Sequence, residues 1–248
     1  MPLVMPDLHG KSVLITGAAR RIGLSIARSF ADAGADVAIT YNTSQEQAEI
    51  ALADLKSRTK RALALPCDVQ DPECVNATVS KVISEFGRLD VLVNNAAVYE
   101  TTSFEDISVQ QWDRMFNTNT RGPFLVTRAA MAALKESRGR VINIGSLGGL
   151  RPWSTHAHYC ASKAALIMLT ETMAKALAPE IAVNCIAPGM INPDQKPLDD
   201  IGQRIAARTP MRRAGTSEDI AEIVLFLATA THFLTGQTIA VDGGLSLE

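Results

Sequence analysis

The chain has 248 residues, of which 47% are hydrophobic and 20% are charged, and its formal net charge is −2. This composition is typical of a globular protein that buries a core, and it excludes a disordered or fibrous chain. The nearly balanced charge lacks the basic excess with which proteins bind nucleic acid, so we expect no such partner. Because no apolar run reaches about 18 residues, we also expect no membrane contact.

Four cysteines are scattered along the sequence, and no two of them form a C-x-x-C pair: Cys67, Cys74, Cys160 and Cys185. This scatter favours free thiols over a disulfide or a metal site. We therefore predict that the protein binds no metal and works in a reducing compartment, the cytoplasm.

Short apolar runs alternate along the chain with longer segments of helical periodicity. The predicted strands are 12–16, 36–41, 61–65, 89–94, 140–145, 182–186 and 238–241, and the predicted helices are 22–34, 45–58, 72–86, 108–137, 156–178 and 217–229. Strands joined by helices form right-handed crossovers and a parallel sheet. The sequence thus predicts an α/β protein: one doubly wound Rossmann-type domain over residues 1–248, with a seven-stranded parallel sheet and helices on both faces.

One stretch, residues 189–210, fits neither a strand nor a helix and contains three prolines. It is too long for a simple connection between elements. Two interpretations stay open, a lid over the substrate and a disordered surface loop.

A glycine-containing turn joins the first predicted strand to the first predicted helix. Gly17, Ile22 and Gly23 lie in it, and glycine there lets the backbone approach a pyrophosphate at the N-terminus of the helix. Arg20 and Arg21 add two guanidinium groups to the same turn. This arrangement predicts a nucleotide site.

The end of the second predicted strand indicates which nucleotide binds. NAD sites usually carry an acidic residue there, whereas this chain has Asn42, Thr43 and Ser44. Guanidinium groups pair well with a 2′-phosphate, so Arg20 and Arg21 favour NADP(H) over NAD(H).

Tyr159 and Lys163 are four residues apart on a predicted helix and therefore share one face. A nearby ammonium group is expected to lower the pKa of the phenol, so that it can exchange a proton with a carbonyl or alcohol oxygen. Ser146 follows a predicted strand, where its hydroxyl can bond a developing alkoxide. His156 and His158 stand at the expected start of the helix, and we expect them to shape that start or the pocket wall.

Together these motifs resemble the classical short-chain dehydrogenase/reductase family over essentially the whole length of the chain. The matching residues are Thr16-Gly17-x-x-x-Arg21-Ile22-Gly23, Cys67-Asp68-Val69, Asn94-Asn95-Ala96-Ala97, Asn119, Ser146, Tyr159-x-x-x-Lys163 and Pro188-Gly189. The resemblance implies a carbonyl reductase that forms a homotetramer or homodimer through the long helices preceding Ser146 and containing Tyr159.

The resemblance also implies a role for each matching residue. Tyr159 would be the general acid/base, Lys163 would lower its pKa and bind the nicotinamide ribose, Ser146 would orient the substrate oxygen, and Asn119 would hold a water in a proton relay. The cofactor contacts would come from Gly17, Arg20, Arg21, Ile22, Gly23, Asn42, Thr43, Ser44, Asp68, Val69, Asn95, Ala96, Tyr159, Lys163, Pro188 and Gly189.

Two kinds of enzyme within this family are candidates for the function of the chain. Arg21 stands where the family usually has a glycine, and in this the chain is similar to the pteridine reductases. Those enzymes, however, often carry aspartate where this chain keeps Ser146. The serine favours a ketone reductase resembling 3-oxoacyl-[acyl-carrier-protein] reductase, with a small carbonyl or acyl-thioester substrate. A pteridine reductase is the alternative, and a non-catalytic NADP(H)-binding regulator is an alternative of another class.

Overall fold

Seven parallel strands form the centre of the molecule, in a computed structural model that describes residues 7–248. Residues 1–6, which the one-domain prediction includes, lie outside the described part. The strands are β1 (Ser12–Ile15), β2 (Asp36–Tyr41), β3 (Ala62–Pro66), β4 (Val91–Asn94), β5 (Arg140–Ile144), β6 (Ala182–Pro188) and β7 (Thr238–Val241). Their order in the sheet is β3-β2-β1-β4-β5-β6-β7, and every neighbouring pair is parallel. The prediction of a doubly wound α/β fold is confirmed.

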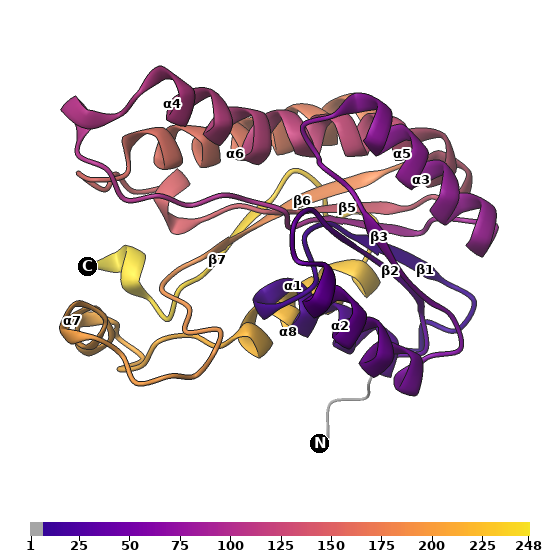
Figure 1. Cartoon of the computed structure of the whole chain (residues 1–248), viewed down its shortest axis with the longest axis horizontal. Helices are drawn as coiled ribbons and strands as arrows, with labels where there is room; N and C mark the ends of the chain where they lie inside the picture. Colours follow the sequence, from indigo (N-terminus) through magenta and orange to yellow (C-terminus); the bar gives the residue numbers. More distant parts are fainter. Residues whose placement is uncertain (1–6) are drawn as a thin grey trace.

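Helices cover both faces of this sheet (Figure 1). The α-helices are α1 (Arg21–Asp32), α2 (Gln45–Arg58), α3 (Pro72–Phe86), α4 (Val109–Phe116), α5 (Gly122–Ser137), α6 (Ala157–Leu177), α7 (Asp200–Arg208) and α8 (Ser217–Thr229). Short 3-10 turns are η1 (Phe104–Asp106), η3 (Leu147–Gly149) and η4 (Leu245–Leu247). Helices α1, α2 and α8 lie on one face, and α3, α4, α5 and α6 lie on the other.

Each central strand contributes side chains to both cores. Val13 and Ile15 of β1 pack in the core under α1 and α8, while Leu14 packs in the core under α3 and α5. Val93 and Leu92 of β4 divide in the same way. A strand buried on both faces has no polar side, which explains the unbroken apolar runs in the sequence.

The long helix predicted over 108–137 is wrong in one respect, because the chain leaves α-helical geometry at its middle. Helix α4 ends at Phe116, a π-helical turn (Asn117–Arg121) follows, and α5 begins at Gly122. Pro123 explains the interruption, since it has no N–H to donate to the carbonyl of Asn119 four residues earlier. The Gly122 N–H bonds to the carbonyl of Asn117 instead, five residues back.

The segment 189–210 also differs from the prediction, because its second half is helix α7. The Asp199 carboxylate accepts a 2.7 Å hydrogen bond from the Gly202 N–H and caps the helix. The expectation of an irregular stretch throughout is therefore wrong. In the described part of the chain, no helix is both long and apolar enough to cross a membrane.

Candidate active site

A large open pocket of about 1680 Å³ lies at the carboxyl ends of the strands. The order in which strands are added to the sheet reverses between β1 and β4. Strands β2 and β3 are added on one side of β1, and β4 to β7 are added on its other side. Parallel α/β sheets bind ligands at such a switch point. All the predicted site residues line this pocket except Asn119, which lies buried behind its wall.

The glycine turn after β1 forms a cradle that admits no larger side chains. Gly17 has a φ of +62°, and a Cβ atom there would lie 2.8 Å from the Cα of Ala96. A Cβ at Gly23 would lie 2.6 Å from the side-chain nitrogen of Asn95. The N-cap of α1 is Arg20, whose side chain has no acceptor atom, and the first turn has no acidic residue. The N-terminus of α1 therefore fits an anion such as a pyrophosphate.

Asn95 and Ala96, which follow β4, hold this turn in place. Their backbone N–H groups each donate a 3.0 Å hydrogen bond to the Thr16 hydroxyl. The Asn95 side-chain nitrogen also donates to the backbone oxygens of Thr16 and Gly17, both at 2.9 Å. These contacts fix the shape of the cradle while both residues remain at the pocket surface.

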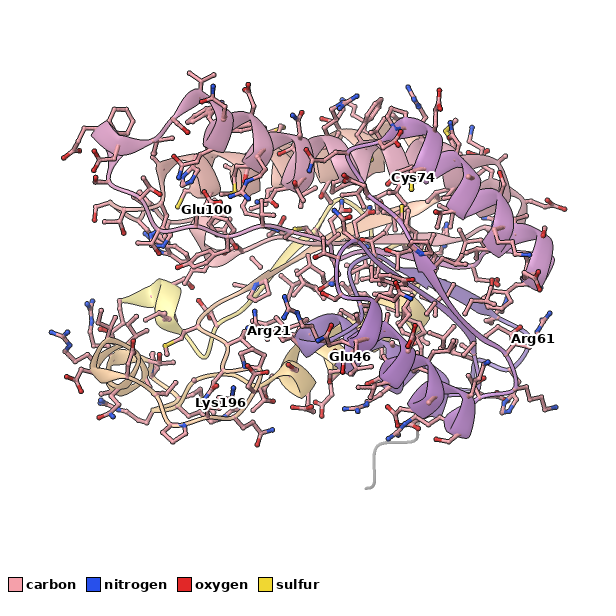
Figure 2. The ribbon with its side chains drawn as sticks, in the orientation of Figure 1. Arg21, Glu46, Arg61, Cys74, Glu100 and Lys196 are labelled. Carbon is pink, nitrogen blue, oxygen red and sulfur yellow. The ribbon has the colours of Figure 1, made fainter. Side chains whose placement is uncertain are left out.

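The end of β2 carries the polar groups that the sequence assigned to a 2′-phosphate. Asn42, Thr43 and Ser44 line the pocket together with Arg20 and Arg21. Arg21, labelled in Figure 2, has a φ of +55°, a left-handed conformation that glycine adopts more easily. Its Nε atom lies 3.9 Å from a carboxylate oxygen of Asp194, a contact that the sequence analysis did not predict.

Two further segments line the pocket on either side of this cradle. In the first, the Asp68 carboxylate accepts a 2.9 Å hydrogen bond from the Gln70 N–H, beside Val69. In the second, Gly189 follows Pro188 at the end of β6, and a Cβ there would lie 2.5 Å from the Cβ of Asp242. Together with the glycine turn, these residues fit an extended dinucleotide.

The residues predicted to transfer the proton meet where β5 ends against α6. The Lys163 Nζ donates a 2.7 Å hydrogen bond to the backbone oxygen of Ile144 and lies 5.9 Å from the ring centroid of Tyr159. Ser146 lines the pocket beside Tyr159, and its hydroxyl oxygen accepts a 3.0 Å hydrogen bond from the Gly148 N–H. The structure thus brings Ser146, Tyr159 and Lys163 together.

Burial controls the ionisation of this group. It raises the pKa of Tyr159 to about 12, and the nearby Ser146 hydroxyl opposes that rise only in part. Burial also lowers the pKa of Lys163 to about 8. The expected lowering of the tyrosine pKa is therefore wrong for this structure. The Lys163 ammonium lies over the ring and bonds to Ile144, and it does not compensate the phenolate for the loss of water.

The Asn119 side chain is fully buried, and its contacts stay within the protein. Its oxygen accepts a 2.9 Å hydrogen bond from the Val98 N–H, and its nitrogen donates to the Val98 oxygen at 3.0 Å and the Ser162 hydroxyl at 3.1 Å. The side chain thus ties α6 to the segment after β4. Its backbone carbonyl lacks an α-helical donor, because residue 123 is a proline. Pro123 is the sequence signal for this feature, which the predicted helix over 108–137 did not take into account.

The two histidines occupy different environments at the start of α6. His156 is the N-cap residue and lines the pocket, whereas the His158 side chain is fully buried, with Nε2 3.8 Å from a carboxylate oxygen of Glu100. Figure 2 labels Glu100 on the α4 side of the molecule. These positions agree with the expectation that the pair shapes the helix start and the pocket wall.

Known proteins resemble this chain over nearly its full length. A family model described as "Enoyl-(Acyl carrier protein) reductase" matches residues 17–246. The 3-oxoacyl-[acyl-carrier-protein] reductase FabG of Staphylococcus aureus is 38% identical over 240 residues, which cover 95% of this chain and 98% of that protein. Two solved structures are similar: a short-chain dehydrogenase/reductase from Serratia marcescens (34% identity, TM-score 0.92, 97% and 99% of the two chains) and a short chain dehydrogenase from Burkholderia cenocepacia in complex with NADP (36%, 0.90, 96% and 99%).

Proposed function

Because the chain belongs to the short-chain dehydrogenase/reductase family, we propose that it is an NADPH-dependent reductase that converts a carbonyl group to an alcohol. The observation that carries this proposal is the meeting of Ser146, Tyr159 and Lys163 in the same pocket as the glycine cradle. Similarity to the FabG proteins favours a 3-oxoacyl thioester as a first candidate substrate. NADPH, when bound, supplies the hydride.

Tyr159 supplies the proton in this proposal. Its raised pKa keeps the phenol protonated at neutral pH, so the side chain starts as an acid, as reduction requires. Ser146 donates a hydrogen bond to the substrate oxygen, on which negative charge develops. Lys163 keeps its own charge below about pH 8 and favours the phenolate that forms as the proton leaves.

The backbone carbonyl of Asn119 would hold the water through which a proton returns to this group. The Asn119 side chain is engaged with Val98 and Ser162, whereas its carbonyl lacks the N–H that a residue other than Pro123 would donate. That carbonyl is therefore our candidate for the group that holds a relay water.

The cofactor preference is the second part of the proposal. Arg20 and Arg21 provide two cations at the cradle, and Asn42, Thr43 and Ser44 provide neutral polar groups in place of an acid. The NADP complex of the Burkholderia relative supports the same choice. Here Asp68 and Val69 would contact the adenine, and Asn95, Ala96, Pro188 and Gly189 would flank the remainder of the dinucleotide.

Domain organisation, assembly and location complete the proposal. We propose that residues 1–248 act as one unit in which 189–210 closes over the substrate, and that α5 and α6 join subunits into a homotetramer or homodimer. The free cysteines support a cytoplasmic location, since thiols persist in reducing compartments.

The test is NADPH oxidation, followed by absorbance, over a panel of an acetoacetyl thioester, simple ketones and dihydrobiopterin. Turnover of a ketone or thioester supports the proposal. Turnover of dihydrobiopterin alone would favour a pteridine reductase, and NADPH binding with no turnover of any substrate would favour a regulator.

A further inference from the structure

The ring of Tyr159 lies among three other aromatic side chains at the pocket surface, which we call the aromatic wall: Tyr99, Trp153 and His156. The rings of Tyr159 and Tyr99 are nearly perpendicular, at 86°, with centroids 4.9 Å apart. Trp153 lies nearly parallel to Tyr159, with centroids 6.1 Å apart at 16°. The wall therefore borders the ring that carries the hydroxyl to which a substrate carbonyl must come.

Hydrogen bonds within the protein fix the positions of two members of this wall, Tyr99 and His156. The Nε2 atom of His156 is 2.6 Å from the Tyr99 hydroxyl and 3.0 Å from the Thr101 hydroxyl, and its Nδ1 atom is 2.9 Å from the Thr155 hydroxyl. Both ring nitrogens of His156 thus have partners inside the protein. We assign His156 to positioning Tyr99, since neither nitrogen is free to exchange a proton with a substrate.

The fixed wall still offers uncovered ring surface. Tyr99 is 59% exposed even though its ring stacks on His156, with centroids 5.0 Å apart. Elsewhere the pocket is lined by one further tyrosine, Tyr41 at the end of β2, and by polar and aliphatic side chains, among them Ile201 and Ile205 of α7. The aromatic surface is therefore concentrated next to Tyr159.

We infer that the aromatic wall binds the ring of a substrate in which an aromatic group is attached directly to the reacting carbonyl. This inference rests on the proposed reductase function and narrows its substrate class. The substrate oxygen must reach Tyr159 and Ser146, so the group attached to the carbonyl carbon lies within reach of Tyr99 and Trp153. An aromatic ring in conjugation with the carbonyl is flat and rigid, and it packs on such side chains better than a saturated ring of the same size.

Two ketones that differ only in this property provide the test. Acetophenone and cyclohexyl methyl ketone have the same carbon skeleton, with an aromatic ring in one and a saturated ring in the other. The ratio of their kcat/KM values with NADPH is compared between variants, so that the different intrinsic reactivities of the two ketones cancel. We expect Tyr99→Leu and Trp153→Leu each to lower the acetophenone preference by about fivefold, the size of one aromatic contact.

Two controls separate aromatic contact from general damage. Tyr99→Phe keeps the ring without its hydroxyl and should retain most of the preference. Phe104→Leu removes an exposed aromatic side chain of η1 that does not line the pocket, and it should leave the ratio unchanged. NADPH titration by fluorescence checks that each variant folds and binds cofactor.

The outcomes distinguish this inference from the proposed function. Equal ratios in the parent protein, Tyr99→Leu and Trp153→Leu would overturn the inference. Reduction of the acetoacetyl thioester without reduction of acetophenone would also overturn it, while the reductase function would stand. If no carbonyl compound were reduced by a protein that binds NADPH, both would fail.

Discussion

The Lys163 Nζ donates a 2.7 Å hydrogen bond to the backbone oxygen of Ile144, which fixes the ammonium group between α6 and the end of β5. Among the described residues, Lys163 is the charged group that we expect to assist proton transfer by Tyr159. The bond to Ile144 holds its ammonium group near the Tyr159 ring. The charge is easily lost, because burial lowers the pKa of Lys163 to about 8.

The first prediction concerns pH. The kcat/KM for NADPH reports the ionisation of the free enzyme, and we expect it to fall by about tenfold per pH unit above about 8, as Lys163 loses its proton. Lys163→Met should lower activity strongly and remove this limb of the profile. Lys175→Met, on an exposed position of the same helix, is the matched control. A limb that persists in Lys163→Met would assign the ionisation to another group.

The same shift has a consequence for stability that does not depend on activity. Between about pH 8 and the ordinary value of 10.5, the unfolded chain holds more protons on Lys163 than the folded protein. The contribution of Lys163 to the free energy of unfolding therefore rises with pH across that window and is constant below it. Denaturant unfolding measured at several pH values should show this rise in the free energy of unfolding for the parent protein and not for Lys163→Met.

The second prediction concerns the choice of cofactor. Arg21→Glu should weaken NADPH binding by at least about tenfold more than NADH binding, because the change replaces a cation near the 2′-phosphate by an anion. Fluorescence titration with both cofactors measures this ratio. Equal losses for the two cofactors would remove the phosphate argument.

Asp194 provides a complementary test of the same site. Its carboxylate lies 3.9 Å from the Arg21 Nε, where it competes with a phosphate for the guanidinium group. Asp194→Asn should therefore strengthen NADPH binding slightly and leave NADH binding unchanged. Weaker NADPH binding would show that the carboxylate serves mainly to hold Arg21 in place.

The third prediction concerns the cradle. Gly17→Ala should lower NADPH affinity by more than about tenfold, because the new methyl group meets the Ala96 backbone and deforms the turn. Gly10→Ala is a sharp control, since Gly10 also has a positive φ of +74° but has no atom within 4 Å of an added Cβ. Gly10→Ala should show only the effect of backbone strain, which lowers the free energy of unfolding by about 1 kcal/mol. Equal NADPH affinities in the two variants would contradict the role of the cradle.

The fourth prediction concerns Asn119. Asn119→Ala removes the partners of the Val98 N–H and carbonyl groups, and we expect it to lower the free energy of unfolding by about 1–3 kcal/mol. Urea unfolding measures the loss. Asn119→Asp keeps the oxygen that accepts from the Val98 N–H but places a second acceptor oxygen against the Val98 carbonyl in a fully buried site, so it should be destabilised at least as much. An unchanged stability in the alanine variant would mean that these hydrogen bonds are not needed to join α6 to this segment.

The sheet was predictable because its strands are covered on both faces and its crossovers are helical. Runs such as Val91, Leu92 and Val93 cannot alternate when neighbouring residues enter different cores. The cradle and the pairing of Tyr159 with Lys163 were also accessible, because short spacings on regular elements fix which side chains share a face.

The remaining features depend on packing between distant segments. Prolines on both sides of helix α7 made the segment resemble a loop in the sequence. The break in the helix at Asn119 depends on a single proline, Pro123. The contact between Arg21 and Asp194 joins segments far apart in the sequence. The pKa of Tyr159 depends on how deeply the fold buries its hydroxyl, which spacing alone does not give.

The most direct test of the account is the turnover of Tyr159→Phe, measured beside its affinity for NADPH. The phenol is the proton donor, so its removal should lower kcat for every carbonyl substrate by about a hundredfold or more, while the Kd for NADPH changes little. A phenylalanine variant that reduced carbonyl compounds at nearly the parent rate would contradict the account.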